Sequence, residues 1–219
     1  MANRRNILIG SGAAVVAAAS GTSLSLLFGA TGAMAQQIDQ AKIMAPAGGY
    51  KDHPEGNPEA KVTVIEYLSP TCPHCAEFAL NFYPQLKADY IDTNKIQFIG
   101  RPFIRNVLDA VVFMLAEAAG PEKYHDVVDT FFKTQATWAS SNTPNDAMFA
   151  IAQQLGFTKE SYDAALKNQE LYAGLEAVQK QALDEFKLQG TPTFYINGNK
   201  HNGGYSFEEL KAAIDPLLA

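Results

Sequence analysis

The chain has little cysteine and little positive charge, and each scarcity excludes a class of protein. Only two of its 219 residues are cysteine, which excludes a small domain stabilised by several disulfides. Seventeen Lys and Arg residues stand against 23 Asp and Glu, giving a formal net charge of −6. An acidic chain without a basic stripe argues against nucleic acid as a partner. Hydrophobic residues make up 47% of the chain, which excludes a disordered protein and suffices for a sizeable core.

The first 35 residues contain no acidic side chain, and Arg4 and Arg5 are their only charges. The uncharged run that follows is rich in Ala, Gly and Ser, and residues 33–35 have the A-x-A form of a cleavage site. We predict a signal peptide over residues 1–35, similar to a twin-arginine signal, although a short basic start also suits Sec export. A retained membrane anchor is the alternative, because the run is long enough to span a bilayer. In either case we expect the folded part to face an oxidising compartment, the periplasm.

Hydrophobic patterning predicts a strand, a helix and a second strand after a turn-rich lead-in. The β-branched, apolar run over residues 61–68 predicts a buried strand, and residues 95–101 predict another. Between them, large apolar residues recur every four positions from 78 to 90, which predicts a helix that Pro84 bends. A strand–helix–strand order implies that the two strands are parallel.

The rest of the chain reads as a long helical block followed by a hairpin and a helix. Residues 106–186 carry only helical periodicity, so we predict an insertion without a strand of its own. Asn197-Gly198 is typical of a tight hairpin turn between short strands. Ser206, with Glu209 three positions later, predicts a capping box that opens the last helix.

Both cysteines belong to the motif Cys72-Pro73-His74-Cys75, which follows a strand and opens a helix. A cysteine there lies beside unpaired N–H groups and the positive end of the helix dipole, which lower the thiol pKa. Pro73 suits the first helical position, and His74 adds positive charge or a hydrogen bond. Cys75 lies one turn later on the same face. We predict a redox-active dithiol in which Cys72 is the nucleophile and Cys75 the buried resolving thiol.

Three competing interpretations of this motif are weaker. A zinc site needs two more ligands, and the remaining histidines, His53, His125 and His201, have no paired spacing. Covalent haem needs a histidine directly after the second cysteine, where Ala76 stands. A purely structural bridge closes too short a loop to stabilise the fold. We therefore expect neither a metal nor a cofactor.

Two further features lie near the motif in the predicted fold. Thr191-Pro192 is an X–Pro bond, the kind of peptide bond at which the cis form costs little free energy. A cis loop beside the sulfurs would expose backbone groups that can pair with an extended substrate. The alternative is an ordinary turn proline. Glu66 lies on an apolar strand six residues before Cys72. It is either a buried carboxylate that accepts the proton of Cys75 or a surface charge on an edge strand.

Residues 56–67, 72–75 and 190–198 together resemble the DsbA-like thioredoxin-fold family of exported bacterial proteins. The resemblance implies an α/β thioredoxin fold with a helical domain inserted between the second strand and the cis-proline strand. It also implies that Cys72 attacks, Cys75 resolves, Glu66 is the buried acid, and Thr191 and cis-Pro192 contact substrate. The predicted divisions are a signal peptide 1–35, a lead-in 36–58, a thioredoxin domain 59–103 and 187–219, and a helical insertion 104–186.

The resemblance implies a periplasmic thiol:disulfide oxidoreductase that introduces disulfides into exported proteins with free cysteines. A membrane redox partner would reoxidise it. Thr191 before the cis-proline is commoner in isomerase-like relatives, so a disulfide reductase or isomerase is the alternative. We see no dimerisation domain, which favours a monomeric oxidase. A third hypothesis is a non-enzymatic exported chaperone or a protein that binds Cu(I) through the two thiolates.

Overall fold

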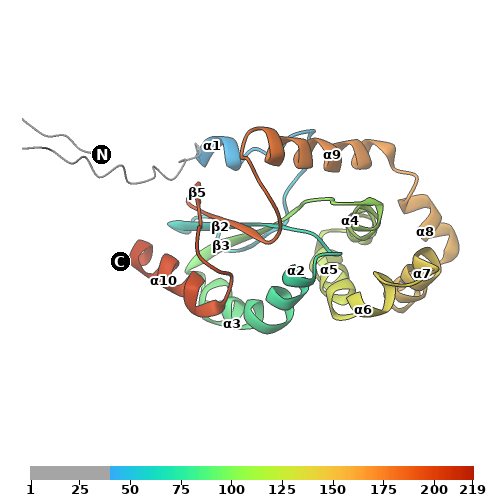
Figure 1. Ribbon diagram of the computed structural model, residues 1–219, viewed down its shortest axis with the longest axis horizontal. Coiled ribbons are helices and arrows are strands. Elements are labelled where there is room, and N and C mark those ends of the chain that lie inside the picture. Colours follow the sequence, from blue (N-terminus) through green and yellow to red (C-terminus); the bar gives the residue numbers. More distant parts are fainter. Residues whose placement is uncertain (1–39) are drawn as a thin grey trace, which may run out of the picture. The chain divides into compact units, whose positions relative to one another are not determined.

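The structure is a computed structural model, and it describes residues 40–219. The predicted signal peptide lies outside the described residues. A five-stranded sheet has the order β1-β3-β2-β4-β5 (Figure 1). Its strands are β1 Pro54–Gly56, β2 Val62–Leu68, β3 Ile96–Pro102, β4 Thr193–Ile196 and β5 Asn199–Lys200.

Strand pairing follows the prediction. β2 and β3 are parallel, with Val62 opposite Ile96, and β4 runs antiparallel to β2 with Glu66 opposite Phe194. The hairpin between β4 and β5 turns at Asn197-Gly198, where both residues have positive φ, as a tight two-residue turn requires. β2 is therefore a central strand with neighbours on both sides.

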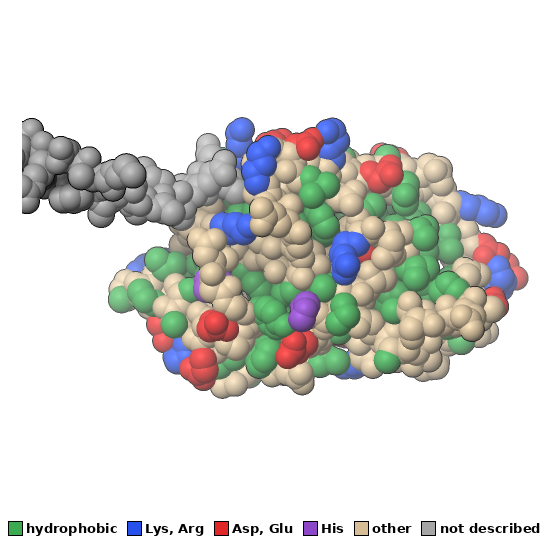
Figure 2. All heavy atoms as spheres, in the orientation of Figure 1, with side chains coloured by type: hydrophobic (Ala, Val, Ile, Leu, Met, Phe, Trp, Pro, Cys, Tyr) green, Lys and Arg blue, Asp and Glu red, His purple; other side chains and the backbone are tan. Residues whose placement is uncertain are grey.

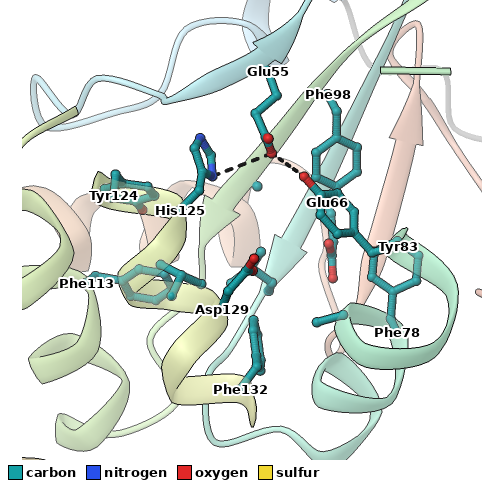
Figure 3. Close-up of a pocket in the computed structure, with 14 residues that line it drawn as sticks. Glu55, Glu66, Phe78, Tyr83, Phe98, Phe113, Tyr124, His125, Asp129 and Phe132 are labelled. Atoms are coloured by element: carbon teal, nitrogen blue, oxygen red, sulfur yellow. Dashed lines mark hydrogen bonds and ion pairs between the residues drawn. The ribbon is translucent and has the colours of Figure 1, made fainter. Parts of the chain in front are cut away.

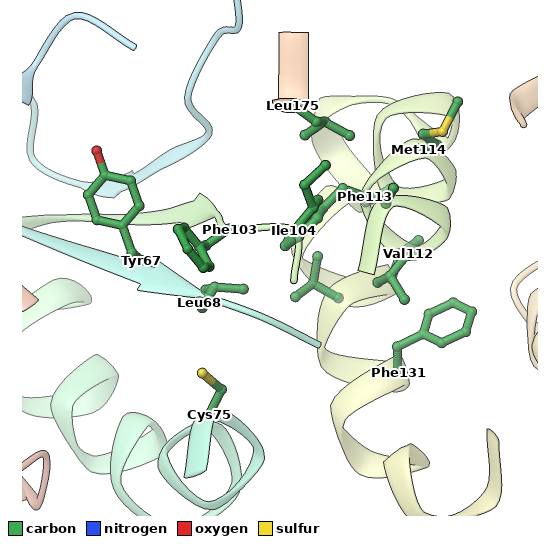
Figure 4. Close-up of a cluster of buried hydrophobic side chains, with 14 of the residues drawn as sticks. Tyr67, Leu68, Cys75, Phe103, Ile104, Val112, Phe113, Met114, Phe131 and Leu175 are labelled. Atoms are coloured by element: carbon green, nitrogen blue, oxygen red, sulfur yellow. The ribbon is translucent and has the colours of Figure 1, made fainter. Parts of the chain in front are cut away.

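Side chains of β2 alternate between two cores because successive residues of a strand point to opposite faces. Val62 and Val64 pack into the smaller core, beneath the helices that follow the motif and the C-terminal helix α10 (Phe207–Leu218). Ile65 and Tyr67 pack into the larger core with the helical block. Figure 4 shows part of that larger cluster, with Cys75 pointing toward Leu68 of β2.

The predicted helix between β2 and β3 is present as one continuous helical run, in which α-helical and π-helical segments alternate. They are α2 Pro73–Glu77, the π-helical η1 Phe78–Phe82, α3 Tyr83–Leu86 and the π-helical η2 Lys87–Ile91. Pro84 lies in the first turn of α3. Because proline lacks an N–H and crowds the preceding turn, the regular hydrogen-bond ladder cannot pass through it.

The helical block lies between β3 and β4, as predicted. It comprises α4 Val107–Ala119, the short η3 Pro121–Lys123, α5 Tyr124–Lys133, α6 Gln135–Trp138, α7 Pro144–Gln154, α8 Lys159–Ala165 and α9 Gln169–Asp184. Side chains of Asn106, Thr158 and Asn168 cap the N-termini of α4, α8 and α9. Trp138 is fully buried and donates its indole N–H to the Phe131 carbonyl at 2.8 Å.

The lead-in contributes more structure than its turn-rich sequence indicated. It forms the short helix α1 (Gln40–Ile43) and β1, which pairs antiparallel with β3. The fully buried Arg101 guanidinium of β3 donates two hydrogen bonds to the carboxylate of Asp52 and a third to the Tyr67 hydroxyl at 3.1 Å. A buried cation requires such partners, so this ion pair fixes the lead-in against the sheet.

Charged side chains of both signs are interspersed on the face drawn in Figure 2, and the described residues form no basic stripe there. Within residues 40–219, no helix combines the length and the hydropathy needed to cross a bilayer.

Candidate active site

The motif begins where β2 ends. A turn closed by Cys72 N–H and the Ser69 carbonyl (3.0 Å) leads into α2, and Cys72 is its N-cap with extended backbone angles. Pro73 occupies the first helical turn, as predicted, and the N–H of Ala76 bonds the Cys72 carbonyl at 3.1 Å. Both cysteines are free thiols, Cys72 4% exposed and Cys75 completely buried.

The surroundings of Cys72 stabilise its thiolate. The hydrogen bond from the Cys75 thiol is the largest influence, and it lowers the pKa of Cys72 to about 4 although burial opposes the shift. The backbone N–H groups of Cys75 and His74 act in the same direction, as the start of a helix provides. Cys72 is therefore an anion at neutral pH when the pair is reduced.

The pKa values of Cys75 and Glu66 are raised, whereas that of Cys72 is lowered. Burial raises the pKa of Cys75, and its bond to Cys72 and the charge of Glu66 raise it further. Burial also raises the pKa of the Glu66 carboxyl, and the Cys72 thiolate adds to that shift. Glu66 is only 3% exposed, so the structure supports the buried carboxylate over the edge-strand charge. One negative charge at Cys72 thus favours protons on both neighbours.

The Thr191-Pro192 bond is cis and lies directly before β4. Because β4 pairs with β2, this loop meets the start of α2. The Thr191 carbonyl oxygen is 3.1 Å from Cys72 Sγ and accepts a hydrogen bond from the thiol when Cys72 is protonated. The structure therefore brings Cys72, Cys75 and the 191–192 loop together, as the sequence predicted.

The His74 side chain is 68% exposed. The Tyr205 hydroxyl donates to Glu77 Oε2 at 2.7 Å, so its oxygen is free to accept from His74 Nδ1 at 2.8 Å. The hydrogen bond to Glu77 raises the pKa of Tyr205 to about 12. His74 thus lies 3.7 Å from the carboxylate of Glu77 and is also connected to it through a tyrosine that no sequence motif marked.

Two residues of the helical block brace the loop before the motif, and sequence reasoning missed both. Asp109 is buried, and its carboxylate accepts from Thr71 N–H at 2.7 Å and from the Ser69 hydroxyl at 2.9 Å. Burial raises the Asp109 pKa, although these bonds oppose the shift. Gln135 donates to the carbonyls of Pro70 (2.7 Å) and Cys72 (3.0 Å). An acid in the first turn of a helix looks like an ordinary partner of the helix dipole, so no sequence pattern distinguishes Asp109.

Among the described residues, no group of three or more His, Cys, Asp or Glu side chains is arranged to hold a metal ion. The two sulfurs, the 191–192 loop and Glu66 make up the chemistry of this site.

The family profile described as Thioredoxin matches residues 50–216. The chain belongs to the thioredoxin family. A protein-disulfide oxidoreductase of Rickettsia bellii is 37% identical over 167 residues, which are 74% of this chain and 63% of the relative. This chain therefore spans about three fifths of the length of that relative. Disulfide bond formation protein D of Bacillus anthracis is 31% identical, covering 74% of this chain and 76% of that protein.

Solved structures of this family share the fold with its helical insertion. The alpha-DsbA1 structure from Wolbachia pipientis has a TM-score of 0.74 and 24% identity, covering 82% of this chain and 96% of that one. A protein-disulfide isomerase from Novosphingobium aromaticivorans has a TM-score of 0.68 and 26% identity, covering 76% of this chain and 97% of that one. The DsbA-like thioredoxin fold predicted from the motifs is confirmed.

Proposed function

We propose that this chain is a periplasmic thiol:disulfide oxidoreductase that introduces disulfides into exported proteins through Cys72 and Cys75. The observation that carries the proposal is the stabilised Cys72 thiolate, which faces the cis-proline loop. A low thiol pKa stabilises the reduced enzyme and therefore makes its disulfide a stronger oxidant. The names of the Rickettsia and Bacillus relatives support the same class of chemistry.

The reaction takes place in two exchanges. A substrate thiolate attacks Cys72 Sγ, the Cys72–Cys75 bond breaks, and the Cys75 sulfur leaves and takes a proton. The second substrate thiolate then attacks the substrate sulfur of the mixed disulfide, and Cys72 leaves as a thiolate. Two electrons pass from substrate to enzyme, and a membrane partner would accept them to restore the disulfide. Thr191 would hold an extended substrate through backbone hydrogen bonds.

The test is catalysis of disulfide formation in a reduced, unfolded protein with two cysteines. We expect the oxidised purified protein to form the substrate disulfide stoichiometrically, and Cys72→Ala to abolish the reaction. Substrate disulfide formation that survives in Cys72→Ala would contradict the enzymatic proposal.

A disulfide isomerase is the second candidate, because a structural relative carries that name and Thr191 precedes the cis-proline. Efficient reshuffling of a scrambled multi-disulfide substrate, together with poor oxidation of the reduced one, would favour it. Fractionation of cells that express the full chain tests the periplasmic location, since the proposal expects recovery in the periplasmic fraction.

A further inference from the structure

A buried backbone N–H group points at the sulfur of Cys75. It belongs to Ser69, the first residue after β2, and its nitrogen lies 3.5 Å from Cys75 Sγ. The larger radius of sulfur makes this an ordinary length for a hydrogen bond to a thiol. Ser69 and Cys75 are both completely buried, so bulk solvent does not compete for the bond. The Ser69 N–H therefore contacts one of the two reacting atoms directly.

The peptide group that carries this N–H is fixed by its neighbours. Its carbonyl, which belongs to Leu68, accepts a hydrogen bond from the Phe103 N–H at 2.8 Å. In a planar trans peptide the C=O and the N–H point in opposite directions, so this bond also sets the direction of the Ser69 N–H. The carbonyl of Ser69 accepts from the Cys72 N–H at 3.0 Å, which fixes the peptide group that follows.

The side chain of Ser69 is held by Asp109, from the first turn of α4. The Ser69 hydroxyl donates to Asp109 Oδ2 at 2.9 Å. The same carboxylate accepts from the backbone N–H groups of Thr71 (2.7 Å) and Arg105 (2.8 Å), and Asp109 is completely buried. A buried carboxylate with three donors cannot move without leaving donors unpaired, so it holds Ser69 in place.

We propose that the Ser69 N–H is a catalytic group which stabilises negative charge on the departing Cys75 sulfur, and that Asp109 is the positioning residue that holds it there. The inference rests on the proposed function. When a substrate thiolate attacks Cys72 Sγ, the Cys72–Cys75 bond breaks and its electron pair passes to Cys75 Sγ. This sulfur bears negative charge until it takes a proton supplied by solvent and becomes a thiol. A fixed donor aimed at that atom stabilises the charge without reorganisation.

The other surroundings of Cys75 oppose a thiolate at this position. Burial raises the pKa of the Cys75 thiol most, and Cys72 and Glu66 raise it further. The Ser69 N–H acts in the opposite direction and lowers that pKa. Because a thiol of lower pKa leaves a disulfide faster, this bond favours the step in which Cys75 departs.

Glu66, the buried acid of β2, has separate surroundings. Its carboxylate lines a cavity together with Glu55 and Asp129 (Figure 3). Neither Ser69 nor Asp109 lines that cavity. A substitution at Asp109 therefore changes the support of the Ser69 N–H and leaves the groups around Glu66 in place.

The test compares Asp109→Asn with Asp146→Asn, which removes an exposed acid from the first turn of α7. Asparagine keeps the size of the side chain, but its amide nitrogen cannot accept from the Ser69 hydroxyl. Oxidised full-length protein is mixed with excess reduced dithiol peptide, and reduction of the Cys72–Cys75 disulfide is followed in acid-quenched samples. We expect Asp109→Asn to slow this step about ten-fold, less than the about hundred-fold loss at an oxyanion, because sulfur is a weaker acceptor. Asp146→Asn should match wild type.

A merely structural role of Asp109 would change more than the rate. Movement of the start of α2 would shift the Cys72 pKa, measured by thiolate absorbance at 240 nm, and with it the redox potential. We expect both to match wild type in Asp109→Asn, because Cys75 is a neutral thiol in the reduced enzyme and the donor acts on its transient charge. Attack of Cys75 on the mixed disulfide, the reverse step, should slow by the same factor, since a catalytic group alters rates and not equilibria.

A second variant leaves Asp109 in place. Ser69→Ala removes the hydroxyl but keeps the carboxylate and its bonds to Thr71 and Arg105, and it should slow the same step by a similar factor. Wild-type rates in both Asp109→Asn and Ser69→Ala would overturn the proposal, and so would slower rates that come with a shifted Cys72 pKa. A wild-type protein that does not oxidise the peptide would instead overturn the proposed function.

Discussion

The stabilised thiolate of Cys72 should be measurable as a pH-dependent part of the stability of the reduced protein. Its pKa falls from an ordinary 9.0 to about 4 on folding. A group whose pKa is lowered by folding stabilises the native state above its unfolded pKa, and this contribution is lost as the pH falls through the folded pKa. At pH 7 the unfolded thiol is protonated, whereas the folded thiol is ionised because its pKa lies about three units below this pH. At about 1.36 kcal/mol per unit, the thiolate contributes about 4 kcal/mol.

The assay is urea denaturation of the reduced protein and of Cys72→Ser at pH 5, 6 and 7. Serine keeps the shape but does not titrate. Because the Cys72 thiolate also raises the pKa of Glu66, both proteins carry Glu66→Gln, so that Cys72 is the titrating group that differs between them. We expect the difference in free energy of unfolding to grow by about 1.4 kcal/mol for each pH unit from 5 to 7. A difference that does not vary with pH would refute the thiolate assignment.

The cause of the shift can be tested separately. The hydrogen bond from the Cys75 thiol is the largest influence on Cys72, so Cys75→Ala should raise the Cys72 pKa and reduce this pH-dependent stabilisation. Thiolate absorbance at 240 nm during an acid titration measures the shift directly. An unchanged midpoint in Cys75→Ala would assign the stabilisation to the helix N-terminus instead.

Three further outcomes are expected. Tyr205→Phe removes the hydroxyl that bonds both His74 and Glu77, while the direct 3.7 Å pair of His74 Nδ1 and Glu77 Oε2 remains, and it should raise the Cys72 pKa by less than one unit by thiolate absorbance; Tyr172→Phe is its control, and equal midpoints would contradict a role of this hydroxyl. Asp109→Ala leaves buried donors of the loop unpaired and should cost about 3 kcal/mol in urea denaturation. Burial raises the Glu66 pKa, so Glu66→Gln should gain stability relative to wild type as pH rises above about 4.3, and a constant difference would contradict its burial.

Sequence reasoning succeeded where the deciding interactions are local. The Ser206–Glu209 capping box, the Asn197-Gly198 turn and the position of Cys72 before α2 each depend on residues within a few positions of one another. Their geometry follows from backbone chemistry that short motifs report directly. The local geometry of the motif was therefore predictable before the fold was known.

Contacts between residues far apart in the chain determine the features that sequence patterns could not predict. Glu66 is buried because β2 lies between β3 and β4, and a strand's own residues do not specify its neighbours. β1 has only three residues and gains its hydrogen bonds entirely from β3. Asp109 and Gln135 reach the motif loop from 38 and 65 positions along the chain. Such contacts leave no periodic trace, so only the folded chain shows them.

The proposed oxidase transfers its own disulfide to substrate. The most direct test is the redox potential of the Cys72–Cys75 couple, measured on the purified protein equilibrated with glutathione buffers at pH 7. A couple with a strongly stabilised thiolate should lie closer to the about −120 mV of DsbA than to the about −270 mV of thioredoxin. A potential near that of thioredoxin would contradict the oxidase and assign the pair to a reductant.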